Sequence, residues 1–208
     1  MKLKKKAKKV LIIIVIVLLL AIAGLVIYKV VGNNKNEVKE VKVLKTIDAY
    51  EYNLKDNKSK HYKELFKELE SILIKEEVND KEYVEKIAEM FIYDFYSLSE
   101  KTAKTDVGGV DFVHPAALGN FLINAEDTYY KYVESNLYGE RKQSLPLVGT
   151  ITIESCTPTE YVYNNQKYSA YEVKANWTYT EESFADYQSS ATLILVKEDI
   201  KYYLVELQ

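Results

Sequence analysis

A run of nineteen uncharged, mostly apolar residues near the start of the chain most constrains how it can fold. The run extends from Val10 to Tyr28, and six lysines precede it within the first nine residues. At ~1.5 Å per residue, a helix of this length measures about 28 Å, close to the hydrocarbon thickness of a bilayer. Lys29 can extend its ammonium group to the interface, so that the apolar helix continues. We therefore expect a transmembrane helix over residues 10–31.

The lysines predict the orientation of this helix. Basic residues beside a span stay in the cytoplasm, which places residues 1–9 inside, a linker over 32–45 and a domain over 46–208 outside the cell membrane. A cleaved signal peptide is the alternative, because Ala21-Ile22-Ala23 offers a small-x-small cleavage pattern. The apolar sequence of residues 24–28 continues past that cut, where a signal peptide would turn polar, and favours the uncleaved single-pass anchor.

Charge divides the chain at the same place. Residues 1–28 contain six lysines and no acid, whereas residues 29–208 contain 22 basic and 31 acidic residues, a net charge of −9. An acidic outer domain argues against nucleic-acid binding and favours a cationic partner or simple solubility. Seven Gly, three Pro and one Cys exclude a collagen-like chain, a disulfide framework and wholesale disorder.

The first part of the outer domain shows a strand-like pattern and then helical periodicity. Residues 46–54 alternate in the manner of one strand. Apolar residues at three- and four-residue steps then predict helices over 62–73 and 79–95. Asn79 or Asp80 is placed to cap the second helix, and Glu82 is placed for a capping-box contact to Asn79. The second helix ends almost wholly apolar, so we expect it to be the central, most buried helix.

A third helical region is expected to be broken by Pro115 and Gly119, to resume through residues 125–133 and to end at about Asn136 to Gly139. Beyond residue 147 the apolar period changes to two, which predicts strands. The expected strands are 148–154, 161–163 and 167 onward around an Asn164-Asn165-Gln166 turn, 171–179 as the longest, and a hairpin of 191–196 with 201–207. Helices followed by an antiparallel meander predict an α+β domain with helices on one sheet face.

This order of elements resembles a known fold, and four segments carry the resemblance: Phe91–Tyr96, His114-Pro115, Ala125–Val133 and Glu172–Tyr179. Together they resemble the nuclear transport factor 2-like fold, in which a curved antiparallel sheet wraps around helices as a cone. With a basic tail and one span, the layout is similar to the bitopic assembly factors of type IV secretion and conjugation systems. Tyr50–Leu54 and Asp106–Gly109 are also similar to segments of small membrane proteins from low-GC Gram-positive bacteria. The resemblance implies an interaction or assembly module.

Few groups in the sequence suit catalysis or metal binding. The only histidines are His61 and His114, and the only cysteine is Cys156, which is expected to be packed rather than nucleophilic. No pair of histidines or cysteines has zinc-ligand spacing, and no acidic loop has calcium spacing. Gly108-Gly109 lacks the other residues of a phosphate loop and is expected to form a turn. We therefore expect no metal, no cofactor and no enzymatic activity.

Five residues are candidates for the polar or aromatic lining of a pocket. Burial of Asp94 on the second helix would raise its pKa and make it an acid or base, as in pockets of fold relatives such as ketosteroid isomerase. The alternative for Asp94 is a carboxylate bound to a tyrosine hydroxyl or a loop N–H. His114 is either a ligand-binding group or a turn residue. Tyr171, Trp177 and Tyr179 either line a pocket under the curved sheet or form core.

Two functional hypotheses follow. The first is a non-enzymatic, membrane-anchored interaction module with a protein partner or a second copy of itself, and the many tyrosines suit such a surface. The second is a receptor or enzyme that holds a small apolar ligand in the cone pocket, with Asp94 or His114 as its polar group.

Overall fold

The computed structural model describes residues 41–208. The expected basic tail, the transmembrane helix over residues 10–31 and the cleavage site after Ala23 lie outside these residues. Within the described part of the chain, no helix is both long and apolar enough to cross a bilayer.

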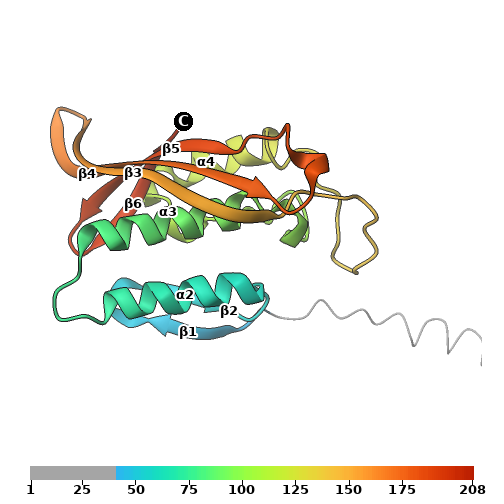
Figure 1. Cartoon of the computed structure of the whole chain (residues 1–208), viewed down its shortest axis with the longest axis horizontal. Helices are drawn as coiled ribbons and strands as arrows, with labels where there is room; N and C mark the ends of the chain where they lie inside the picture. Colours follow the sequence, from blue (N-terminus) through green and yellow to red (C-terminus); the bar gives the residue numbers. More distant parts are fainter. Residues whose placement is uncertain (1–40) are drawn as a thin grey trace, which may run out of the picture. The chain divides into compact units, whose positions relative to one another are not determined.

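The described residues form the α+β domain predicted from the sequence. Its three α-helices are α2 (Lys60–Leu73), α3 (Asp80–Tyr96) and α4 (Pro115–Asp127). The main sheet is antiparallel in the order β3-β4-β5-β6, with β3 (Val148–Tyr163), β4 (Gln166–Tyr179), β5 (Ser190–Glu198) and β6 (Lys201–Leu207). A separate hairpin pairs β1 (Val43–Ile47) with β2 (Tyr52–Lys55). Figure 1 shows the sheet above α3, and α2 with the small hairpin below it.

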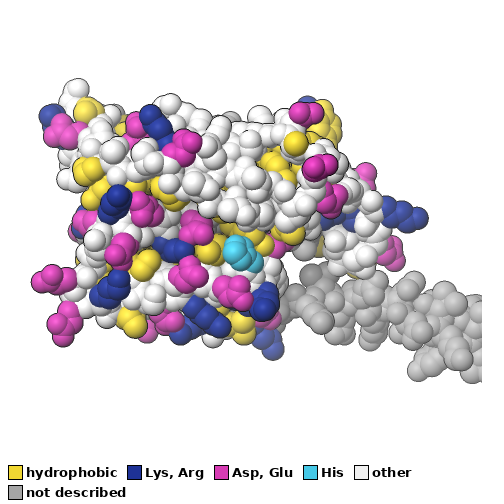
Figure 2. Space-filling model, in the orientation of Figure 1, with side chains coloured by type: hydrophobic (Ala, Val, Ile, Leu, Met, Phe, Trp, Pro, Cys, Tyr) yellow, Lys and Arg dark blue, Asp and Glu magenta, His cyan; other side chains and the backbone are white. Residues whose placement is uncertain are grey.

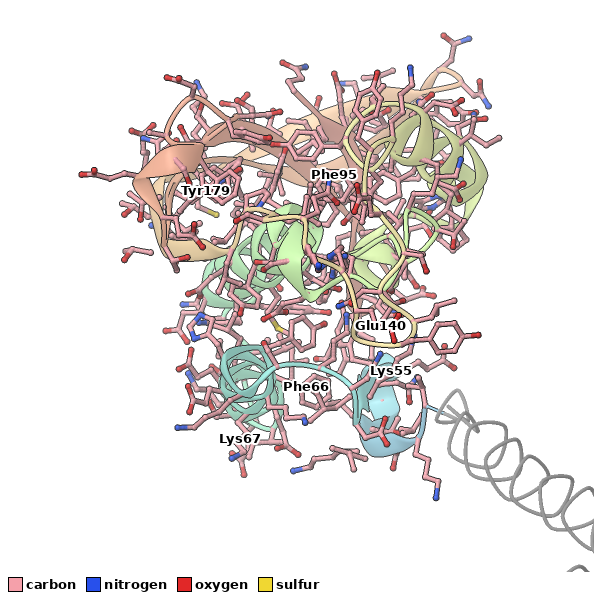
Figure 3. All side chains as sticks on the ribbon, turned by 90° about the vertical axis from the view of Figure 1, so that its right-hand side faces the viewer. Lys55, Phe66, Lys67, Phe95, Glu140 and Tyr179 are labelled. Atoms are coloured by element: carbon pink, nitrogen blue, oxygen red, sulfur yellow. The ribbon has the colours of Figure 1, made fainter. Side chains whose placement is uncertain are left out.

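The two long helices follow their predicted periodicity. In α2, Phe66 points into the layer between the helix and the small hairpin while Lys67 points outward (Figure 3). The Asn79 side chain caps α3 as expected, because its Oδ1 accepts hydrogen bonds from the backbone N–H groups of Lys81 and Glu82. The expected capping-box contact does not form, since the carboxylate of Glu82 pairs with the Lys75 ammonium at 2.7 Å.

The C-terminal half of α3 is the buried centre of the domain, as predicted. Every residue from Met90 to Leu98 is buried. The sheet covers one side of this helix and α2 covers the other, so no side remains for solvent (Figure 1). This arrangement explains why the apolar stripe of α3 widens along the helix until it is apolar nearly all round.

The single strand predicted over residues 46–54 is wrong. The chain reverses in a short 3-10 turn over Asp48–Tyr50, and Glu51 adopts a left-handed backbone with a φ of 55°. β2 then runs back along β1, with Tyr52 opposite Ile47. The pattern of alternating side chains survives such a reversal, because the turn leaves Tyr52 and Leu54 facing the core.

The third helical region also differs from its prediction. Pro115 starts α4 instead of breaking a helix, because the first helical position needs no N–H donor. Gly119 lies inside the helix with open space around it, and its entropic cost of ~1 kcal/mol is tolerated there. The helix ends at Asp127, and residues 128–132 form turns rather than a resumed helix.

β3 is longer than predicted and is the longest strand of the described residues. It continues past Glu154 to Tyr163, and Pro158 is tolerated because β3 is an edge strand. The predicted turn at Asn164-Asn165 is confirmed, with φ values of 50° and 60° that suit a two-residue hairpin turn. The last pair between β4 and β5 is Ala170 with Val196, so the tip of the β3–β4 hairpin projects beyond β5 (Figure 1).

Candidate functional site

The most buried polar cluster of the domain surrounds Asp94 on α3. The Lys101 ammonium lies 2.6 Å from Asp94 Oδ1, and the Lys58 ammonium lies 2.7 Å from both carboxylate oxygens. The backbone N–H of Gly109 donates to Oδ2 at 2.8 Å. One carboxylate therefore joins the segment before α2, the helix α3 and two loops that follow it.

These contacts decide the protonation state of Asp94. Burial alone would raise its pKa, but the positive charges of Lys101 and Lys58 and the N–H of Gly109 together hold the pKa well below its usual range. Asp94 is therefore ionised at neutral pH, and the prediction that its pKa is raised is wrong. The alternative, a carboxylate bound to a loop N–H, is confirmed.

The Gly108-Gly109 turn, confirmed by the structure, closes this cluster. The N–H of Gly108 donates to the Tyr130 hydroxyl, which donates in turn to the carbonyl of Phe95. A Cβ atom on Gly108 would lie 2.0 Å from the Asp94 carbonyl oxygen, so the loop and α3 approach too closely for a side chain. Gly109 has a φ of +74°, which favours glycine.

The three aromatic candidates of β4 do not line a common pocket. Trp177 is 3% exposed and packs on Tyr96 with ring centroids 4.3 Å apart, so its core role is confirmed. Tyr171 packs on Tyr202 toward the opposite end of the strand. Tyr179 is half-buried on the sheet, eight residues from Tyr171 (Figure 3). The three side chains do share one face of β4, as predicted. α3 packs against that face and leaves no common pocket there.

Cys156 on β3 is buried, and burial raises the pKa of its thiol to about 11. A thiol with this pKa is protonated at neutral pH and is a poor nucleophile. Among residues 41–208, no group of three or more metal-ligating side chains comes together.

An open pocket of about 420 Å³ lies between α4 and the end of β6, and we call it the α4–β6 pocket. Its lining includes Phe95, Phe121, Asn124, Tyr129, Leu204 and Gln208. Phe95 points into the layer between the sheet and α4 (Figure 3). The hydroxyl of Tyr129 is buried and has no hydrogen-bond partner among the described residues.

A second pocket, of about 300 Å³, contains His114, and we call it the tyrosine pocket. Its lining includes Tyr161, Tyr163 and Tyr168 from the β3–β4 hairpin, together with His114 at the start of α4 and Glu198 at the end of β5. Asp94 lines neither this pocket nor the α4–β6 pocket. Of the five predicted pocket residues, His114 lines one of these two pockets and the other four line neither.

His114 is held by contacts on both ring nitrogens. Its Nδ1 accepts a hydrogen bond from the Ala116 N–H at 3.1 Å and caps α4. An accepting Nδ1 leaves the proton of the neutral ring on Nε2, which donates to Glu198 Oε1 at 3.1 Å. The ring also meets the Tyr203 ring edge-on at 5.5 Å. His114 is thus the predicted turn residue and also borders a pocket.

The sequence analysis identified neither Glu198 nor the tyrosines of the β3–β4 hairpin as site residues. The register of the hairpin was the available signal, because pairing across an Asn164-Asn165 turn sets Tyr161 opposite Tyr168. No pattern in the sequence indicated that the β3–β4 hairpin lies close to the start of α4.

Comparison with known proteins finds no matching family model, no matching curated protein and no matching solved structure.

Proposed function

We propose that residues 41–208 form an extracytoplasmic binding module that acts by recognition rather than catalysis and is held at the cell membrane by the helix expected over residues 10–31. Its partner is another protein or a second copy of the chain. The observation that carries this proposal is the projecting tip of the β3–β4 hairpin. Val162 and Tyr163 there are 58% and 56% exposed.

The chemistry of this tip suits protein recognition. Tyrosine combines a large apolar ring with a polar hydroxyl and loses little entropy on binding, which is why it recurs in binding sites between proteins. The tip also extends beyond the last pairing of β4 with β5, so a partner can reach the face that carries Tyr161 and Tyr168. Figure 2 shows charged side chains gathered over α2 and the small hairpin, and a largely uncharged surface over the sheet.

The order of three helices and a four-stranded antiparallel sheet supports a nuclear transport factor 2-like cone as the finer description of this domain. The same order supports a role like that of the membrane-anchored assembly factors of secretion and conjugation systems. Mass measurement of the mature N-terminus tests the anchor, which requires that Ala21-Ile22-Ala23 remain uncut.

Site-specific photocrosslinking of the full chain in cells tests the proposed function. A photoreactive phenylalanine at Tyr163 is expected to form one defined adduct, either with a partner or with a second copy. The same group at Tyr132, which is 75% exposed on another loop, is the matched control. The adduct is expected to weaken in a Tyr161→Leu background and to persist in an Asp186→Asn background. A chain that remains monomeric and forms no adduct from Tyr163 contradicts the proposal.

A small-ligand receptor is the second candidate, and the α4–β6 pocket favours it. The pocket volume of about 420 Å³ falls within the range of small-molecule sites. Its lining combines the apolar rings of Phe95 and Phe121 with the polar side chains of Asn124 and Gln208. Titration of the full chain with the dye anilinonaphthalene sulfonate tests this candidate. Saturable binding that is lost in an Asn124→Trp variant, which narrows this pocket and not the tyrosine pocket, supports the candidate, and binding that is equal in both chains refutes it.

A further inference from the structure

The tyrosine pocket combines aromatic rings with one carboxylate, a combination that recognises organic cations. We propose that this pocket binds a basic side chain, a lysine ammonium or an arginine guanidinium, presented by the protein partner. The proposal rests on the proposed function, because it names the chemical group through which the hairpin recognises that partner.

The rings are placed for this purpose by the hairpin register. Tyr161 lies directly opposite Tyr168 across β3 and β4, so the two side chains share one face of the sheet. Tyr163 follows two residues after Tyr161 and lies on that same face. All three line the pocket. A cation that enters can therefore meet the electron-rich faces of more than one ring.

The carboxylate of Glu198 provides the negative charge. Its side chain is 42% exposed, and its Oε1 accepts the hydrogen bond from the His114 imidazole. His114 is itself held by the Ala116 N–H, so the carboxylate is oriented from a fixed helix terminus. Among the described residues, Glu198 forms no pair with a lysine or arginine, and its charge is available to a ligand.

The domain uses the same contact elsewhere. Ammonium groups of Lys201, Lys58 and Lys197 lie 4.3 to 5.3 Å from the centroids of tyrosine rings. None of these three lysines lines the tyrosine pocket. Three lysines of the domain thus lie against tyrosine rings, whereas no lysine or arginine of residues 41–208 lines the pocket in which three tyrosines lie beside Glu198.

Pocket size and overall charge favour a side chain as the source of the cation. About 300 Å³ is the lower limit for small-molecule sites but is ample for one long side chain. Residues 41–208 carry 19 basic and 29 acidic residues, so the domain attracts basic surfaces.

Saturation-transfer NMR on the full chain in nonionic detergent tests the proposal. The probes are the peptide acetyl-Gly-Lys-Gly-amide and the same peptide with norleucine, which keeps the alkyl chain but lacks the ammonium group. The lysine peptide is expected to saturate and to bind at least fivefold more tightly than the norleucine peptide. Glu198→Gln is expected to weaken the lysine peptide about fivefold, and Tyr161→Leu about threefold, the range for exposed cation–π contacts.

Two matched controls separate the pocket from general charge and hydrophobicity. Glu140→Gln and Tyr132→Leu alter exposed residues outside the pocket and are expected to leave binding unchanged. Equal binding of both peptides overturns the proposal, as does equal binding by the wild-type chain and the Glu198→Gln variant. Circular dichroism verifies that each variant is folded.

A third probe distinguishes a protein source from a free small molecule. Choline and its uncharged carbon analogue 3,3-dimethylbutanol are titrated under the same conditions. Choline that binds ten times more tightly than the lysine peptide overturns the side-chain source. A crosslinked partner at Tyr163 without lysine binding refutes only this inference, whereas lysine binding with no crosslinked partner refutes the proposed function.

Discussion

Asp94 and Glu198 are two carboxylates in one domain that meet opposite surroundings. Asp94 is 4% exposed and accepts from two ammonium groups and a backbone N–H. Glu198 lies at the rim of a pocket and has one imidazole as its partner. Asp94 has no capacity left for a ligand, while Glu198 does. Burial among apolar residues, which drew attention to Asp94 in the sequence, therefore marks a structural role here.

The comparison is tested most strongly by Asp94→Asn. This change leaves the buried ammonium groups of Lys101 and Lys58 without their counter-charge, which costs about 3–5 kcal/mol of unfolding free energy. Urea titration of the full chain, followed by circular dichroism, measures the loss. Asp186→Asn, an exposed change of the same kind, is expected to stay within about 0.5 kcal/mol of wild type. A small loss for Asp94→Asn would remove the distinction between the two carboxylates.

The closeness of the Gly108-Gly109 loop to α3 is tested by a pair of glycine changes. Gly109→Ala combines a φ of +74° with a Cβ atom 2.5 Å from the Phe91 ring, and should cost about 2–4 kcal/mol. Gly139→Ala has a φ of +73° but open space, and should cost only about 1 kcal/mol. The same urea titration measures both. Equal losses would show that packing around Asp94 adds nothing to backbone strain.

The dependence of stability on acid pH tests whether Asp94 is ionised in the folded protein. The pKa of Asp94 is held below its ordinary value in the folded state, so its contribution to stability is complete above the unfolded-state value of about 3.9. As pH falls through that value toward the lower folded pKa, the contribution is lost. The stability gap between wild type and Asp94→Asn should therefore be constant above about pH 5 and shrink below about pH 4. A gap that stays constant down to pH 3 would show that folding does not lower the pKa of Asp94.

Sequence patterns predicted those features of the fold that depend on a few neighbouring residues of one element. The Asn79 cap, the stripe of α3 and the Asn164-Asn165 turn each depend on a few neighbouring residues, and all are confirmed. The sequence did not predict the β1–β2 hairpin or the start of α4, because each residue pattern is compatible with two different backbone conformations. A left-handed Glu51 reverses the chain without changing the alternation, and Pro115 suits a helix start as well as a break.

The candidate site was predictable only in part, for a different reason. His114 was recognisable as a turn residue from the proline that follows it, but its partner Glu198 is 84 positions away. Asp94 illustrates the converse error: the sequence revealed its burial, but one lysine that lowers its pKa, Lys58, comes from the segment before α2, and the other, Lys101, comes from the loop after α3. Charge compensation over such separations depends on tertiary packing, which no local period encodes.

The smallest expected effect concerns the stability of the Glu198→Gln variant. The Glu198 side chain is 42% exposed, and an ion pair or hydrogen bond at such a surface contributes little. Glutamine keeps an oxygen that can accept from His114 Nε2, so the free energy of unfolding should change by less than about 0.5 kcal/mol, as for Glu140→Gln. Thermal and urea unfolding of both variants measure this. A loss above about 1 kcal/mol would mean that Glu198 also serves the fold, and the contrast with Asp94 would disappear. A neutral result, together with weaker binding of the lysine peptide, would assign Glu198 to recognition alone.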